Sequence, residues 1–266
     1  MSIDPLLFTE LFVLGLVIGY LAGLLGIGGG MLMVPFLVWV LSAQGVGETH
    51  LVKMAVATSL ATICFTSLSS VRAHHQRGAV LWPVVLVLAP GILVGSLAGA
   101  NLAVALPAKV LTVLFALFVT FSATQMLLNK KPKPGRGLPG SAGMFGVGSL
   151  IGILSSMVGA GGAFVSVPFM TWCNVSIHKA VATSAALGFP IALAGSLAYV
   201  WAGWGRADLP PGAWGYLYGP GLISIALGSM LTAPLGARAA HRMDIALLKK
   251  IFAVFLYLMA AYFLLR

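Results

Sequence analysis

The sequence predicts an all-α integral membrane protein built from two copies of one multi-helix unit. The first observation is composition: 60% of the residues are hydrophobic, 8% are charged and the mean hydropathy is +1.05, whereas soluble domains carry about 25% charged residues. The second is that apolar segments of bilayer-spanning length recur along the whole chain. The third is an internal repeat. Together these observations exclude an ordinary soluble fold, which could not bury so much apolar surface.

Apolar runs separated by charged, proline-rich or glycine-rich breaks predict the helices. Most runs approach the roughly 20 residues that a spanning helix needs, but residues 30–43 and 163–173 are too short to cross comfortably. No positive region precedes the first run, so we expect it to be retained and not cleaved as a signal peptide. The predicted segments are 6–25, 30–43, 54–72, 80–104, 107–128, 139–158, 163–173, 180–201, 213–237 and 246–265.

The basic residues predict the topology. Lys and Arg are enriched in the cytoplasmic connectors of membrane proteins, and all three basic clusters lie on one side only if each short segment pairs with its predecessor as a hairpin. Glu48 and both termini then lie outside. The alternative is eight simple spans, in which each hairpin is one long helix and the two halves have the same orientation. The clusters are Arg72 and Arg77; Lys130, Lys131, Lys133 and Arg136; and Arg238, Arg242, Lys249 and Lys250.

The strongest pattern is the internal repeat. The segment 26–36 recurs as 159–169, and 55–59 recurs as 180–184. Each copy is expected to hold a broken-helix hairpin plus three transmembrane helices, and this odd number of crossings makes the two repeats inverted. Inverted repeats supply two equivalent arrangements, one open to each side, as alternating access requires. The expected divisions are transmembrane repeat 1 over residues 1–129, a cytoplasmic linker over 130–138 and transmembrane repeat 2 over 139–266.

Glycine clusters interrupt both predicted hairpins. We expect them to face inward, because non-helical backbone at membrane depth survives only where it is buried in protein or lines a wet cavity. The short helix after each cluster begins with N–H groups that lack intrahelical partners and carry the positive end of the helix dipole, which suits an anion. The alternative role is tight helix packing. The candidate substrate-binding positions are Gly28, Gly29 and Gly30 in the first copy and Gly161, Gly162 and Ala163 in the second.

Hydroxyl side chains follow both hairpins at equivalent positions. They are Thr58 and Ser59 in the first copy, and Thr183 and Ser184 in the second. Hydroxyl donors suit an oxyanion, so all four are candidate substrate-binding residues. Serine and threonine in membrane helices also commonly bond their own backbone or a neighbouring helix, and that alternative stays open here.

Charged residues are kept out of the predicted spans. His74 and Arg77 lie in a cytoplasmic connector, where they are candidates for gating or cytoplasmic contact, with a solvated or headgroup role as the alternative. The acidic residues fall at termini or connectors, which argues against a buried proton relay. An anion can leave a negative-inside cell along the electric field without a coupling ion. The acidic residues are Asp4, Glu10, Glu48, Asp208 and Asp244.

Other functional classes have little support in the sequence. The basic residues form no aromatic-interleaved stripe of the kind that binds nucleic acid, and no catalytic constellation is visible, so we do not expect an enzyme. Cys64 and Cys173 lack metal-ligand spacing, so we expect packing roles for them, with no metal and no cofactor. The expected partners are a small anion and the lipid bilayer, and the oligomeric state stays open.

At the glycine segment 26–36, the two Ala-Thr-Ser segments and the Pro-Gly turns, the chain resembles the sulfite exporter TauE/SafE family of bacterial membrane permeases. The resemblance covers nearly the whole chain. It implies a multi-pass transporter of the bacterial cytoplasmic (inner) membrane for sulfur-containing anions such as sulfite, sulfonates or sulfoacetate, usually working outward. An anion channel on the same fold is the alternative.

The second copy departs from the pattern of the first. Ala163 stands opposite Gly30, and the His-x-x-Arg-Gly connector that starts at His74 is missing, with Tyr199 opposite that histidine and Gly203 opposite Gly78. We therefore do not expect the two halves to contribute equally to a site.

Overall fold

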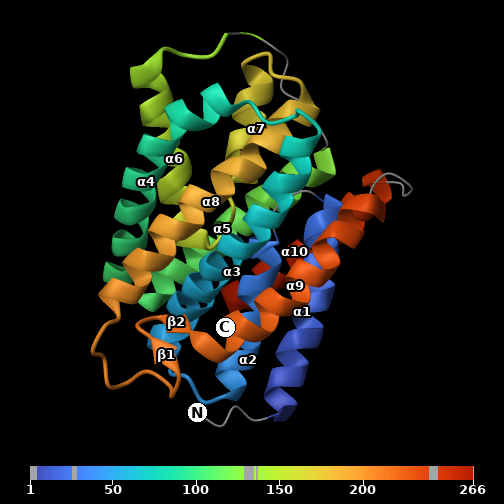
Figure 1. Cartoon of the computed structure of the whole chain (residues 1–266). Helices are drawn as coiled ribbons and strands as arrows, with labels where there is room; N and C mark the ends of the chain where they lie inside the picture. The colour runs from blue at the N-terminus through green and yellow to red at the C-terminus, as the bar shows by residue number, and fades with distance from the viewer. Residues whose placement is uncertain (1–4, 26–28, 129–134, 136, 240–244, 266) are drawn as a thin grey trace.

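The computed structural model describes residues 5–25, 29–128, 135, 137–239 and 245–265. This part of the chain is almost entirely helical, with one short two-stranded antiparallel ribbon (Figure 1). The helices in the first half are α1 (Pro5–Leu25), α2 (Gly30–Ala43), α3 (Glu48–Gln76), α4 (Trp82–Ala105) and α5 (Ala108–Leu128). The second half contains α6 (Ser141–Val158), α7 (Ala163–Trp172), α8 (Ile177–Ala202), β1 (Ala213–Trp214), β2 (Leu217–Tyr218), α9 (Gly219–Ala239) and α10 (Ile245–Leu265).

The all-α membrane fold is confirmed. Among the described residues, seven helices are long and apolar enough to cross a membrane, namely α1, α3, α4, α5, α6, α8 and α9. By contrast, α2 has 14 residues and α7 has 10, which gives lengths of about 21 and 15 Å at 1.5 Å per residue. Both are shorter than the roughly 30 Å hydrocarbon core of a bilayer, so neither helix spans it alone.

The two short helices complete broken hairpins. In Figure 1 α1 rises from the end that carries the N-terminus and α2 returns towards it, while α6 and α7 form the corresponding pair from the opposite end. The alternative of one continuous helix through each hairpin is wrong, because α1 ends at Leu25 before α2 begins at Gly30, and α6 ends at Val158 before α7 begins at Ala163.

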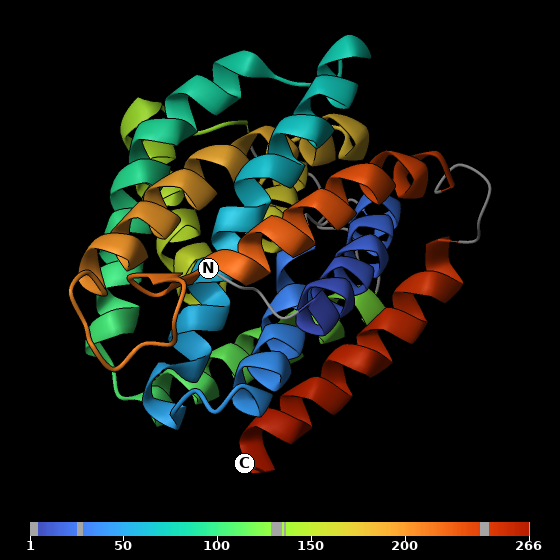
Figure 2. The same ribbon diagram turned by 60° about the horizontal axis from the view of Figure 1, so that its bottom comes forward.

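The strongest helix contacts join the two halves of the chain. Helix α1 packs along α9, α4 packs along α6, and α5 packs along α10, while α3 and α8 cross at the centre and are the most buried of the long helices. Figure 2 shows α10 running along the outside of the bundle. The two sequence repeats are therefore interleaved in one helical body.

Glycines allow the closest of these contacts. A Cβ atom placed on Gly95 of α4 would lie 2.1 Å from the carbonyl oxygen of Ser149 on α6, and one on Gly15 of α1 would lie 2.6 Å from that of Ile225 on α9. No side chain fits at such distances, so backbone packs directly on backbone, as in other small-residue membrane interfaces.

The ends of α3, α5 and α9 lie in the upper half of Figure 1, opposite the starts of α1 and α3. Along the chain, the three basic clusters lie at or follow these helix ends. The hairpin topology requires all three clusters to lie on the same side of the membrane. The following predicted residues of the basic clusters lie outside the described residues: Lys130, Lys131, Lys133, Arg136 and Arg242. The cytoplasmic assignment of that end stays a prediction.

Candidate functional site

The two helix breaks use left-handed glycines. Gly29 precedes α2 with φ 68° and Gly162 precedes α7 with φ 77°, while Gly159 ends α6 with φ 71°. Side chains with a Cβ rarely adopt these angles, so glycine is the residue that lets each chain stop one helix and start the next. Gly28 lies outside the described residues.

The two breaks meet inside the protein. A Cβ atom on Gly30, at the start of α2, would lie only 2.3 Å from the carbonyl oxygen of Gly159, at the end of α6. Gly161 lies against α8, with its carbonyl oxygen 3.6 Å from the place where a Cβ on Gly188 would stand. Segments far apart in the sequence thus come into backbone contact at the predicted positions.

Ser59 joins the two breaks. Its buried hydroxyl lies 2.9 Å from the carbonyl oxygen of Gly159 and 3.2 Å from that of Gly30, and donates to this pair of acceptors. The sequence placed Ser59 near the breaks but left its partner open, and the partner is backbone from both repeats. In this arrangement its proton is used within the protein.

The two predicted threonines take equivalent roles. Thr58 on α3 accepts a hydrogen bond from the backbone N–H of Tyr218, just before α9, at 3.0 Å. Thr183 on α8 accepts one from the N–H of Leu81, just before α4, also at 3.0 Å. Both threonines are fully buried. Each hydroxyl oxygen acts as an acceptor, so its own proton remains available to a second partner.

Ser184 pairs with a residue that the sequence did not single out. Its hydroxyl lies 2.7 Å from that of Ser166 on α7, and both side chains are buried. The contact fixes the short helix α7 to the central helix α8. Ser166 takes the place of Met33 in the first copy, and that departure from the repeat was the signal that could have identified it.

Each short helix begins with N–H groups that have no partner within the helix. The N–H groups of Leu32 and Met33 bond to the carbonyl oxygen of Gly29, and the second break repeats the pattern at Gly162. The N–H groups before them, of Gly30 and Met31 in α2 and of Ala163 and Phe164 in α7, precede the first intrahelical bond. Buried N–H groups at the positive end of a helix are suited to holding an anion.

His74 and Arg77 do not join this site. They lie at the far end of α3, with His74 roughly 22 Å along the helix from Ser59 at 1.5 Å per residue. The backbone N–H of Arg77 bonds to the carbonyl oxygen of His74 as the helix ends. A gating or cytoplasmic role at that end stays a prediction.

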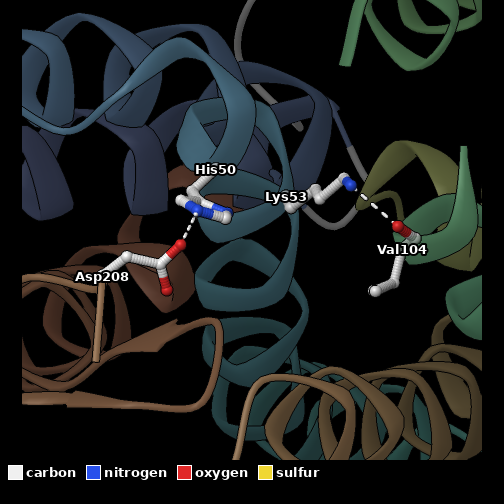
Figure 3. Close-up of polar contacts among 4 residues, drawn as sticks. All are labelled: His50, Lys53, Val104 and Asp208. Atoms are coloured by element: carbon white, nitrogen blue, oxygen red, sulfur yellow. Dashed lines mark hydrogen bonds and ion pairs between the residues drawn. The ribbon is translucent and has the colours of Figure 1, made fainter. Parts of the chain in front are cut away.

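Two polar contacts fix the other end of α3 (Figure 3). His50 donates from Nε2 to Oδ2 of Asp208 at 2.6 Å, and Lys53 donates from Nζ to the carbonyl oxygen of Val104 at 2.7 Å. The hydrogen bond from His50 holds the pKa of Asp208 below its ordinary value. Lys53 is only 6% exposed and places its charge at the carboxyl end of α4, where the helix dipole favours a cation. The sequence did not identify either contact.

The comparison with known protein families is decisive. The family model for the sulfite exporter TauE/SafE matches residues 11–263. The chain belongs to the sulfite exporter TauE/SafE family. It is therefore a membrane transporter of that family, and its multi-pass helical fold agrees with that membership.

Relatives of this TauE/SafE member span nearly its whole length. It is 36% identical over 248 residues to a probable membrane transporter protein of Haemophilus influenzae, covering 92% of this chain and 94% of the relative. It is 28% identical over 260 residues to the probable membrane transporter protein YdhB of Bacillus subtilis, with 94% and 95% covered. No solved structure matches the chain.

Among the residues that the structure describes, no group of three or more His, Cys, Asp or Glu side chains could hold a metal ion. Cys64 is half-buried and Cys173 is buried, and the two are not joined in a disulfide.

Proposed function

We propose that the protein carries small sulfur-containing oxyanions, such as sulfite, sulfonates or sulfoacetate, out of the cell across the bacterial cytoplasmic membrane. The proposal rests chiefly on one observation, the contact between the two helix breaks that Ser59 bridges. Helices α2 and α7 begin at these breaks, and the four predicted hydroxyl side chains are all buried, which supports a common binding region.

The donor set favours an anion. The amino ends of α2 and α7 offer backbone N–H groups, and Thr58 and Thr183 offer hydroxyl protons. None of these groups carries a full charge, so they can hold an oxyanion without binding it as strongly as a buried lysine or arginine. A carrier needs that balance, because its cargo has to leave again.

Alternating access around this region would follow from inverted repeats. The swapped packing of α1 on α9 and of α4 on α6 supports such a relation, and so do the matched bonds of Thr58 and Thr183. Two equivalent arrangements would expose the site to one side and then to the other.

Export would run with the membrane potential. An anion that leaves a negative-inside cell gains about 2.3 kcal/mol per charge per 100 mV. No coupling ion is then needed.

The test is flux through purified protein in vesicles. We expect saturable, electrogenic movement of sulfite and of at least one of sulfate and sulfoacetate, with competition between the carried anions. Large single-channel currents without saturation would support a channel instead, and a requirement for a proton or sodium gradient would overturn uncoupled export. Fluxes no higher than in protein-free vesicles would refute the proposal.

A further inference from the structure

Two serine hydroxyls near the second break are buried without a partner. Of the buried side-chain nitrogen and oxygen atoms in the described residues, Nδ1 of His50 and the hydroxyls of Ser96 and Ser155 have no hydrogen-bond partner. Several other buried serines in these helices bond to a carbonyl one turn earlier, as Ser122 and Ser224 do. A buried hydroxyl without a hydrogen-bond partner destabilises the fold. A bound ligand is one reason why a protein would contain such a group.

Ser155 lies at the amino end of α7. It belongs to the last turn of α6, and its hydroxyl oxygen lies 3.3 Å from the place where a Cβ on Gly162 would stand. Gly162 caps α7, whose first N–H groups, those of Ala163 and Phe164, lack intrahelical partners. The unpartnered hydroxyl and the first N–H groups of α7 therefore both lie beside Gly162.

The first break has no such hydroxyl. Ala22 takes the position of Ser155 in the repeat, and its methyl group lies 2.8 Å from the place where a Cβ on Gly29 would stand. At the second break Cδ1 of Ile191 on α8 lies nearer still, at 2.5 Å, and Ile151 lies at 3.3 Å. The first break has Ile18, at 3.3 Å, beside Ala22. The second break therefore differs from the first by a hydrogen-bond donor in the matching position and by the isoleucine from α8.

The second unpartnered hydroxyl lies on the helix packed against this turn. Ser96 is on α4, and its backbone nitrogen lies 2.7 Å from the place where a Cβ on Gly152 would stand, one turn before Ser155. Ser96 and Ser155 are both 0% exposed. Ser96 therefore lies in the α4–α6 contact, one turn of α6 away from Ser155.

We infer that the oxyanion binds at the second break, and that Ser155 is the side-chain donor that positions one of its oxygens at the amino end of α7. The inference rests on the proposed function and makes its site asymmetric. The first break, with Ala22 in the matching place, serves the packing of the two repeats.

The test is sulfite flux through vesicles that contain the full-length Ser155→Ala protein. We expect the KM for sulfite to rise about 10- to 100-fold, the loss that corresponds to one hydrogen bond to a charged group. The maximal rate should change much less, because the helix breaks stay intact. Ser122→Ala is the matched control, since that buried hydroxyl bonds only to its own helix, and its KM should stay within about twofold.

A second variant protects the test against misfolding. If Ser155→Ala is not recovered as a single monodisperse species, Ser155→Cys keeps nearly the same volume with a weaker donor, and its KM should also rise. An unchanged KM in whichever variant folds overturns the assignment of Ser155 while leaving anion transport intact. Absence of any anion flux in the wild-type protein would instead overturn the proposed function, and the inference with it.

Discussion

Small hydroxyl side chains and glycines determine how the interrupted helices fit together. Ser59 reaches backbone of both breaks, whereas Ser184 reaches a side chain of α7. The internal repeat identified these serines as candidate site residues, because they occupy matching positions in the two copies. It could not predict their partners, because each partner comes from a segment distant in the chain.

Replacing Ser59 with alanine tests the bridge between the breaks. The change leaves two buried carbonyl oxygens without this donor, so we expect the free energy of unfolding to fall by about 1–3 kcal/mol. Thermal unfolding in detergent measures this, with Tm lowered by roughly 2–4 °C for each kcal/mol. Ser224→Ala is the control, because that hydroxyl bonds within its own helix. Equal Tm values for the two variants would contradict the bridging role.

Gly29→Val and Gly162→Val should each abolish anion flux while the protein still inserts into the membrane. A β-branched residue at φ 68° or 77° is strained by about 1–2 kcal/mol or more, and its Cβ would stand 2.8 Å from the methyl group of Ala22 or 2.5 Å from Cδ1 of Ile191. Gly45→Val is the matched control, because Gly45 has φ 77° with no atom within 4 Å. Normal flux in either variant would exclude that glycine from the mechanism.

At the scale of elements, the β1–β2 segment (residues 205–218) closes one end of the bundle over α3. Its outer part is bound through Asp208 to His50, and its inner part is bound through the N–H of Tyr218 to Thr58. Tyr216 and Tyr218 are nearly fully buried. The segment therefore connects the surface to a residue next to the helix breaks.

Asp208→Ala should loosen the β1–β2 segment near neutral pH. Because His50 lowers the pKa of Asp208 in the folded protein, the contact stabilises the fold above the ordinary aspartate pKa of about 3.9 and is lost as the pH falls through the lowered value. Hydrogen–deuterium exchange of residues 205–217 should be faster in the variant than in the wild type at neutral pH, and the difference should vanish in acid.

Glu10→Ala is the control for that measurement, because Glu10 is an exposed carboxylate on α1. It should leave the exchange of the β1–β2 segment unchanged. A difference between wild type and Asp208→Ala that persists in acid would show that the contact with His50 is not what holds the segment.

At the scale of the whole molecule, the packing of helices from one repeat against helices of the other organises the bundle. Every long helix of one repeat packs against the other repeat, including α1 on α9 and α4 on α6. Relative movement of the two repeats must therefore slide glycine-lined contacts past each other. Those contacts involve backbone more than long side chains, so they carry few interlocking groups that would oppose sliding.

The topology can be tested by labelling from one side of the membrane. The end of α8 and the start of α6 lie at opposite ends of the bundle (Figure 1). In a background without Cys64 and Cys173, Trp204→Cys places a single thiol directly after α8, and Gly137→Cys places one shortly before α6. An impermeant maleimide added to intact cells should label Trp204→Cys only, and Gly137→Cys should react only after permeabilisation. Labelling of both from outside would contradict the hairpin topology with the basic connectors in the cytoplasm.

The sequence by itself determined the membrane class, most of the helical segments and both short helices, including the range 30–43 of α2. These features are local, because they depend on the length of apolar runs and on glycines that end a helix wherever they occur. The repeat also identified Thr58, Ser59, Thr183 and Ser184 as matched positions before their partners were known. The predicted segment 213–237 was wrong at its start, because residues 213–218 hold the β1–β2 ribbon and α9 begins at Gly219.

Only the tertiary structure decided that the two breaks touch, that Ser59 binds backbone of both, and that Ser155 has a free hydroxyl where Ala22 has a methyl group. These facts arise from the approach of segments more than a hundred residues apart. The pattern of a helix in the sequence shows which of its residues lie on one turn. Which residues of another helix they contact depends on how the two helices pack together.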